Sequence, residues 1–174
     1  HIINEYGAQG MGEEHVHSVS GLAPGVMAQT GMETMEIIRG VIEETRPDII
    51  VAIDALAARS LRRLNRTIQI TDTGINPGSG VGNHRTGLNR ETLGIKVIGI
   101  GVPTVVDGAT IVHDAMSHLL DALEEAEKKE FLEEMIAPSL HSMFVTPKDV
   151  DDTIKRLAYT ISEGLNMTFT AEKA

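Results

Sequence analysis

The sequence predicts an α/β fold with a mostly parallel sheet and helices on both of its faces. Two short apolar runs, Ile49–Ile53 and Lys96–Ile100, lack the alternation of half-exposed strands and indicate strands buried on both sides. Segments with helical spacing separate them, and strands that alternate with helices form parallel sheets. We expect the two strands to be parallel, adjacent or one strand apart, in a single α/β domain spanning residues 1–174.

Apolar spacing and capping residues predict four helices, which are Thr30–Arg46, Ala55–Leu64, Thr110–Lys128 and a last helix from Thr146 to Gly164. Pro47 ends the first helix, and Gly164 is a typical C′ residue for the last. Thr67–Ile70 is predicted to be a short strand, followed by a long glycine-rich loop over residues 71–94. Four arginines on the polar side of the second helix and just beyond its end are interpreted as a solvated face: Arg59, Arg62, Arg63 and Arg66.

One carboxylate, Asp54, directly follows the predicted strand Ile49–Ile53. Open α/β sheets place ligands and catalytic groups at the carboxyl ends of their strands. Aspartate is also a favoured helix N-cap, and the helix Ala55–Leu64 would begin at this point. The local pattern therefore leaves a catalytic and a capping role open.

The composition excludes several classes of function. The net charge is −10 and aromatic residues make up only 3%, without tryptophan, so neither counterion release nor base stacking supports nucleic-acid binding. No apolar run has the length of a membrane span, and no secretory signal is visible. The chain has no cysteine, which fits a reducing compartment. We expect a cytoplasmic protein that binds neither nucleic acid nor membrane.

Several longer strings carry a resemblance to a known family. They are SGLAPGVMAQTG at 20–31, PDIIVAIDALAARS at 47–60, TIQI at 67–70, DTGI at 72–75, PGSGVGN at 77–83 and IGIGVPTVVD at 98–107. Together they resemble the germination protease of spore-forming bacteria, the endopeptidase that degrades small acid-soluble spore proteins. The resemblance is dense over about residues 16–114 and looser elsewhere.

The resemblance implies an aspartic-type peptidase that uses two essential aspartates, with a fold similar to that of the hydrogenase-maturation peptidases. Asp54, within AIDALAARS, matches the second aspartate. The first belongs to a T-P-D motif that this chain lacks, which makes the chain a C-terminal portion of a longer protein, inactive in isolation. The resemblance further implies a zymogen, a homotetramer, a location in the spore core, small acid-soluble spore proteins as substrate, and no cofactor. Association with its own N-terminal segment is the alternative to the tetramer.

Alternatives remain open at the site. Asp72 and Asp107 each follow a strand-like segment and are candidate partners for Asp54, although turn or cap roles suit both. In the glycine-rich loop, Gly80, Asn83 and Arg85 are weak candidates for contacts with a substrate chain. The loop does not match a phosphate-binding motif, because no Gly-Lys-Ser/Thr closes it.

Metal chemistry is the competing enzymatic hypothesis. The pairs His15 with His17 and Asp114 with His118 each lack the third and fourth ligands of a closed zinc site, so no metal is predicted. A metal-dependent maturation peptidase of related fold would instead draw on histidines such as His84 and His113. A non-catalytic scaffold is the third possibility. In every case a sheet without its missing neighbour should expose a large apolar surface or bury it in an oligomer or against partner chains.

Overall fold

The structure is a computed structural model that describes residues 18–25, 32–78, 86–117, 127 and 136–170. The chain forms two compact units, one spanning Thr45–Ile154 and the other combining His1–Glu44 with Lys155–Ala174. The sheet lies entirely within the first of them. The expectation of a single domain over 1–174 stays a prediction. Among the helices of the described ranges, none combines the length and the apolarity needed to cross a bilayer.

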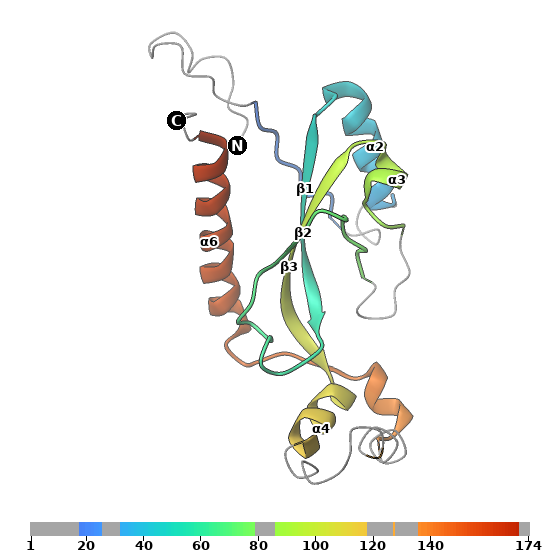
Figure 1. The fold of residues 1–174 in the computed structure, drawn as a ribbon, viewed down its shortest axis with the longest axis vertical. Coiled ribbons are helices and arrows are strands. Elements are labelled where there is room, and N and C mark those ends of the chain that lie inside the picture. The colour runs from blue at the N-terminus through green and yellow to red at the C-terminus, as the bar shows by residue number, and fades with distance from the viewer. Residues whose placement is uncertain (1–17, 26–31, 79–85, 118–126, 128–135, 171–174) are drawn as a thin grey trace. The chain divides into compact units, whose positions relative to one another are not determined.

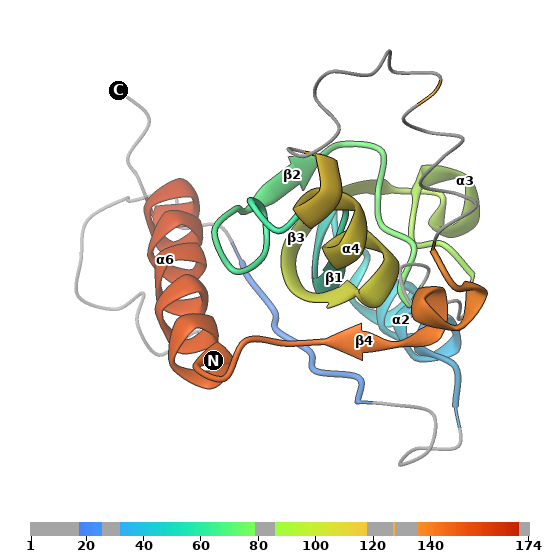
Figure 2. The same ribbon diagram turned by 90° about the horizontal axis from the view of Figure 1, so that it is seen from below.

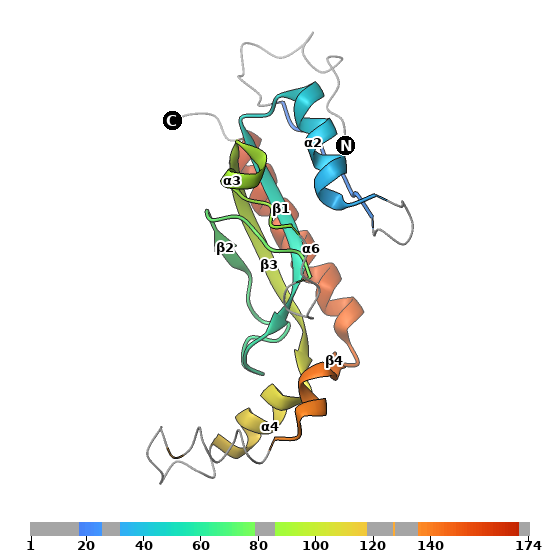
Figure 3. The ribbon, with the colours of Figure 1, turned by 90° about the vertical axis from the view of Figure 1, so that its right-hand side faces the viewer.

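The sheet is centred on β3, with β1 on one side and β2 on the other (Figures 1 and 3). Its strands are β1 Ile49–Ala58, β2 Gln69–Thr71, β3 Lys96–Asp107 and β4 Phe144–Val145. β1 and β3 are parallel and adjacent over ten paired positions, whereas β2 and β4 pair antiparallel with β3 over three and two positions. The predicted parallel pair is therefore confirmed, within a mixed α/β architecture whose open sheet is mostly parallel.

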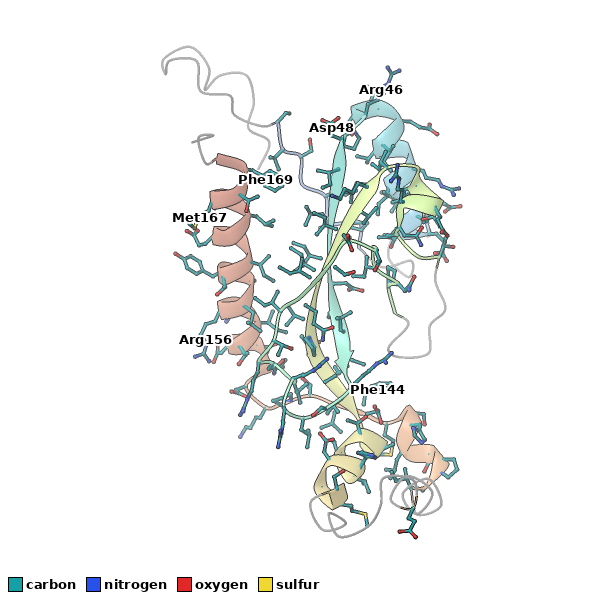
Figure 4. All side chains as sticks on the ribbon, in the orientation of Figure 1. Arg46, Asp48, Phe144, Arg156, Met167 and Phe169 are labelled. Carbon is teal, nitrogen blue, oxygen red and sulfur yellow. The ribbon has the colours of Figure 1, made fainter. Side chains whose placement is uncertain are left out.

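The burial of the strands follows from their neighbours. β3 is nearly enclosed, with Val97 and Val106 each only 1% exposed. β1 is mostly half-buried, because in the described part of the chain it pairs with β3 alone. Before β1, Arg46 and Asp48 flank Pro47 at the entrance to the strand (Figure 4).

The predicted helix Ala55–Leu64 is wrong. β1 continues past Asp54 to Ala58, and its last four residues pair with the stretch Val102–Val106 of β3. Alanine and leucine favour helices locally, but pairing with a long β-branched strand outweighs that small preference. Two hydrogen-bonded turns follow over residues 60–66 instead of a helix.

The second strand is also longer than predicted, since β3 runs through Gly101 and Pro103 instead of turning there. Proline cannot donate to a strand ladder and is tolerated at edges or bulges. The register between β1 and β3 shifts between Leu56 and Ala57, opposite Pro103, and β2 ends its pairing at Gly101. Pro103 therefore lies at the β-bulge in its pairing with β1 and beyond the end of the pairing with β2, so neither ladder requires the N–H that proline lacks.

Helix α4, Gly108–Ser117, begins two residues before the predicted start at Thr110, and the rest of the predicted helix falls mostly outside the described residues. It packs Ala109 against Ile136 in a small core that Leu140 of the 3₁₀ helix η3, Pro138–Ser142, completes. In Figure 2 α4 continues from the end of β3.

The glycine-rich loop is more structured at its ends than predicted. Ile75 and Leu88 form a two-bond antiparallel bridge, with N···O distances of 2.9 and 2.8 Å. A short helix, α3 Arg90–Leu93, then begins with a capping box between Asn89 and Thr92. Both features lie inside residues 71–94, which the sequence pattern predicts as loop throughout.

Two helices complete the description, α2 Thr34–Thr45 and α6 Val150–Thr170. α2 begins one turn later than the Thr30 prediction, with the Glu36 carboxylate accepting from the Glu33 amide at 3.0 Å. α6 begins at Val150, and Thr146 donates its hydroxyl proton to the carbonyl of Thr104 at 2.9 Å instead of capping the helix. α6 also passes through Gly164, so the predicted stop there is wrong.

Candidate active site

Asp54 is the sixth of the ten residues of β1 and lies opposite Gly101 of β3. It is therefore inside a strand, so the prediction that the strand ends at Ile53 is wrong, and the alternative role as a helix N-cap does not apply because no helix begins there. Its side chain is half-buried, and its Oδ1 accepts a hydrogen bond from the Ala55 amide at 2.9 Å. The β-bulge begins two residues further along the strand, and such bulges are frequent beside active sites.

Glycines of β3 form the sheet surface next to Asp54. Gly101 pairs with Asp54 on one side and Gln69 on the other, while Gly99 pairs with Ala52 and Thr71. A Cβ on Gly101 would collide with the Leu56 side chain, and one on Gly99 would lie 2.8 Å from the Gly74 carbonyl oxygen. A side chain at Gly99 would clash with backbone, whereas one at Gly101 would have to displace the Leu56 side chain, which lies over this glycine. The surface between Asp54 and Gln69 therefore carries no side chain from β3.

The two alternative partner aspartates do not meet Asp54. Asp107 ends β3 six residues beyond Gly101, which places it about 20 Å along the sheet from Asp54. Asp72 follows Thr71, which pairs with Gly99, so it lies two strands across and about 14 Å away. Carboxyl groups that share a proton lie about 3 Å apart. The structure therefore does not bring either one to Asp54.

Asp107 has a structural role that uses both of its oxygens. Oδ1 accepts from the Thr110 amide at 2.8 Å and Oδ2 from the Thr110 hydroxyl at 2.7 Å, which makes Asp107 the N-cap of α4. Burial raises the pKa of Asp107, but the two bonds from Thr110 and the nearby His141 outweigh burial and lower it overall. This carboxylate stays charged at neutral pH and serves the helix.

Asp114 and His113 on α4 also form contacts that explain them structurally. The Asp114 Oδ2 accepts from the Ser60 hydroxyl at 3.0 Å and from the Leu61 amide at 2.7 Å. The Nδ1 of His113 lies 3.8 Å from the other oxygen of Asp114 and close to the Ser117 hydroxyl. The Ser60 hydroxyl bonds to Asp114 and not to His113. The three side chains therefore do not form a serine-histidine-aspartate relay.

The remaining candidates lie outside the described residues. These are Gly80, Asn83 and Arg85 of the loop, together with His15, His17, His84 and His118. Among the residues that the structure does describe, no three histidine, aspartate or glutamate side chains cluster as ligands for a metal ion.

Two features of the site escape the sequence pattern. One is the extension of β1 beyond Asp54, for which the only signal is the β-branched residues on either side of Pro103 in the partner strand. The other is the contact between Ser60 and Asp114, which joins residues 54 positions apart and leaves no local signal.

The comparisons with known proteins agree with one another. The family model for germination protease matches residues 7–123 and 117–173. The germination protease of Caldanaerobacter subterraneus subsp. tengcongensis is 44% identical over 182 residues, covering 95% of this chain and 56% of the relative. Those of Clostridium tetani and Bacillus subtilis are 45% and 41% identical over 172 and 201 residues, covering 89% and 88% of this chain.

This chain spans about half the length of the curated relatives it matches, between 53% and 56% of each of those three. The matches nevertheless cover most of the chain, and identities above 40% over such lengths fix the relationship. The strings that surround Asp54 and Gly101 are part of the matched region. The chain belongs to the germination protease family.

Proposed function

We propose that this chain is the part of a germination endopeptidase that carries one of two catalytic aspartates, Asp54. The observation that supports this most is the family membership combined with the setting of Asp54, half-buried in a parallel strand beside side-chain-free Gly101. The proposed substrates are small acid-soluble spore proteins, cleaved at internal peptide bonds in the spore core during germination.

The mechanism requires a second carboxyl group. In an aspartic-type reaction one carboxylate removes a proton from water while its protonated partner donates to the leaving amine, which needs two groups with separated pKa values. Asp72 and Asp107 are too far from Asp54 for this role. We propose that the partner aspartate lies in the portion of the relatives that this chain does not match.

The same proposal accounts for the half-exposed state of β1. The outer side of β1 has no strand partner in the described part of the chain, and a neighbouring strand there would bring a further side chain close to Asp54. We infer an architecture like that of the hydrogenase-maturation peptidases, completed by that strand. Zymogen synthesis and a homotetrameric assembly belong to the same proposal.

The test compares a full-length enzyme containing this chain with its Asp54→Asn variant on a purified small acid-soluble spore protein. Asparagine keeps the size of the side chain and removes its charge, so the variant should fold normally. Its kcat should fall by at least about 10²–10⁴-fold, as expected when a general base is lost. A chelator should leave the rate of the unaltered enzyme unchanged.

The matched control is Asp72→Asn, which removes the same charge from an exposed turn two strands away and should retain full activity. An Asp54→Asn enzyme that still cleaves would remove Asp54 from the chemistry. Loss of activity on chelation would instead favour the metal-dependent alternative.

A further inference from the structure

Four arginines gather in the connection between β1 and β2, which we call the arginine turn, residues 59–66. Arg59, Arg62, Arg63 and Arg66 all have exposed side chains. This is four of the 15 lysines and arginines of the chain within eight residues, in a protein of net charge −10. Within the described residues, the structure shows none of the four guanidinium groups in an ion pair.

The backbone of the arginine turn is held at both ends. At its start, the Ser60 hydroxyl and the Leu61 amide both donate to Asp114 on α4, at 3.0 and 2.7 Å. At its far end, the Asn65 amide donates to the Pro103 carbonyl of β3 at 2.8 Å. The turn is therefore tied to two other elements of the same unit, and its arginines project from a fixed backbone.

Hydrogen bonds within the turn add to this order. The Arg63 amide donates to the Ser60 carbonyl at 3.0 Å, and the Arg66 amide donates to the Arg63 carbonyl at 3.1 Å. Asn65 adopts a left-handed conformation with φ of 55°. Four positive charges held close together on such a frame repel one another. An anionic partner that binds to the arginines would offset this repulsion.

The position of the turn relates it to Asp54. It follows the carboxyl end of β1, the side on which open α/β sheets bind ligands. Ala58 lies four residues beyond Asp54, so the start of the turn is about 13–17 Å from that carboxylate. An extended peptide whose scissile bond lies at Asp54 would reach the arginines with a residue about four or five positions away.

The four arginines of the arginine turn favour one kind of ligand, an acidic peptide segment. Guanidinium forks bind carboxylates with paired hydrogen bonds, and several adjacent forks fit a run of acidic side chains. A nucleic acid needs clustered positive charge along the length of its phosphate backbone, which a chain of net charge −10 does not offer, whereas a short acidic segment needs to face only the arginine turn. We propose that the arginine turn binds an acidic segment of the protein substrate, four or five residues from the cleaved bond. This rests on the proposed function.

The experiment measures binding, which needs no hydrolysis. The probes are a fluorescent synthetic peptide with a run of glutamates, the same peptide with glutamines, and a single-stranded oligonucleotide of similar length. Fluorescence anisotropy at low ionic strength gives the affinity of each for the 174-residue chain and for an Arg62→Gln, Arg63→Gln, Arg66→Gln variant. Arg59 is retained because it adjoins Ser60.

The matched control is an Arg46→Gln, Lys96→Gln, Lys148→Gln variant, which removes three exposed positive charges elsewhere in the same unit. The glutamate peptide should bind, the glutamine peptide should bind at least about tenfold more weakly, and the arginine variant should lose affinity for the glutamate peptide by about tenfold. The control variant should bind as the unaltered chain does, and thermal unfolding should show that both variants fold.

Equal binding of the two peptides, or equal losses in the two variants, would overturn the proposal. Tighter binding of the oligonucleotide through the same arginines would assign the surface to nucleic acid and overturn it as well. An Asp54→Asn chain should bind the glutamate peptide unchanged. Binding without Asp54-dependent cleavage would therefore contradict only the proposed function, and Asp54-dependent cleavage without binding would contradict only this inference.

Discussion

At the scale of single residues, the acidic side chains differ in what their oxygens already bind. Both oxygens of Asp107 accept from Thr110, and one oxygen of Asp114 accepts two bonds from the arginine turn. These two carboxylates hold elements in place. Asp54 lies inside a strand beside Gly101, where one of its oxygens accepts from the Ala55 amide and no helix begins for it to cap.

Replacing Asp107 with alanine should lower the free energy of unfolding by about 1 kcal/mol, the usual effect of losing an N-cap. The pKa of Asp107 lies below its ordinary value of 3.8 in the folded protein, so its contribution is present above that pH and is lost as the pH falls through the lowered value. Urea unfolding at neutral pH and near pH 3 measures both. The stability difference should be smaller at the acidic pH, whereas Asp72→Ala, in an exposed turn, should have little effect at either.

At the scale of elements, pairing and burial outweigh local preference in two places. Ala55–Ala58 has helical composition but extends β1, because β3 offers it a partner. Gly164 has the character of a helix terminator, yet α6 continues to Thr170. The apolar stripe of α6 explains the second case, since Leu157, Ile161, Leu165 and Phe169 are all half-buried at helical spacing on either side of the glycine.

Substituting Gly164 with alanine should raise stability by about 0.5–1 kcal/mol. Glycine within a helix is less favourable than alanine by this amount, and a Cβ at position 164 would meet no atom within 4 Å. The change in the urea midpoint measures the effect. A loss of stability would indicate that the helix ends at Gly164 in a left-handed conformation, as the sequence predicts. Gly74→Ala is the opposite control, because Gly74 has φ of 86° and its Cβ would overlap the Leu88 carbonyl oxygen.

At the scale of the whole molecule, one face of the sheet presents an isoleucine row across three strands. Ile53, Ile100 and Ile70 are paired in register from β1 through β3 to β2. The central residue is only 6% exposed, but the outer two are 52% and 70% exposed. Exposed apolar rows on open sheets favour association with other chains, as the prediction of an uncovered apolar surface anticipates.

The double substitution Ile53→Lys and Ile70→Lys should therefore reduce self-association of this chain. Lysine at such exposed positions keeps its aliphatic stem against the sheet while its charge opposes contact with another copy. Sedimentation velocity over a range of concentrations measures the distribution of species. Met167→Lys, which alters a side chain 71% exposed on α6, is the matched control and should leave the distribution unchanged. An unaltered distribution in the double variant would show that the isoleucine row is not an association surface.

The sequence by itself determined the two buried strand segments, their parallel pairing, the α/β class and the family to which the chain belongs. Each of these depends on apolar runs or on family motifs of consecutive residues, which can be recognised in the sequence without knowing which residues are in contact. Only the tertiary structure decided that β1 continues through Asp54, that a bulge accommodates Pro103, and that Asp72 and Asp107 lie far from Asp54. It also decided that Asp114 and Pro103 fix the arginine turn. The physical reason is that these features are stabilised by hydrogen bonds and packing between distant residues, which outweigh local preferences of less than about 1 kcal/mol per residue.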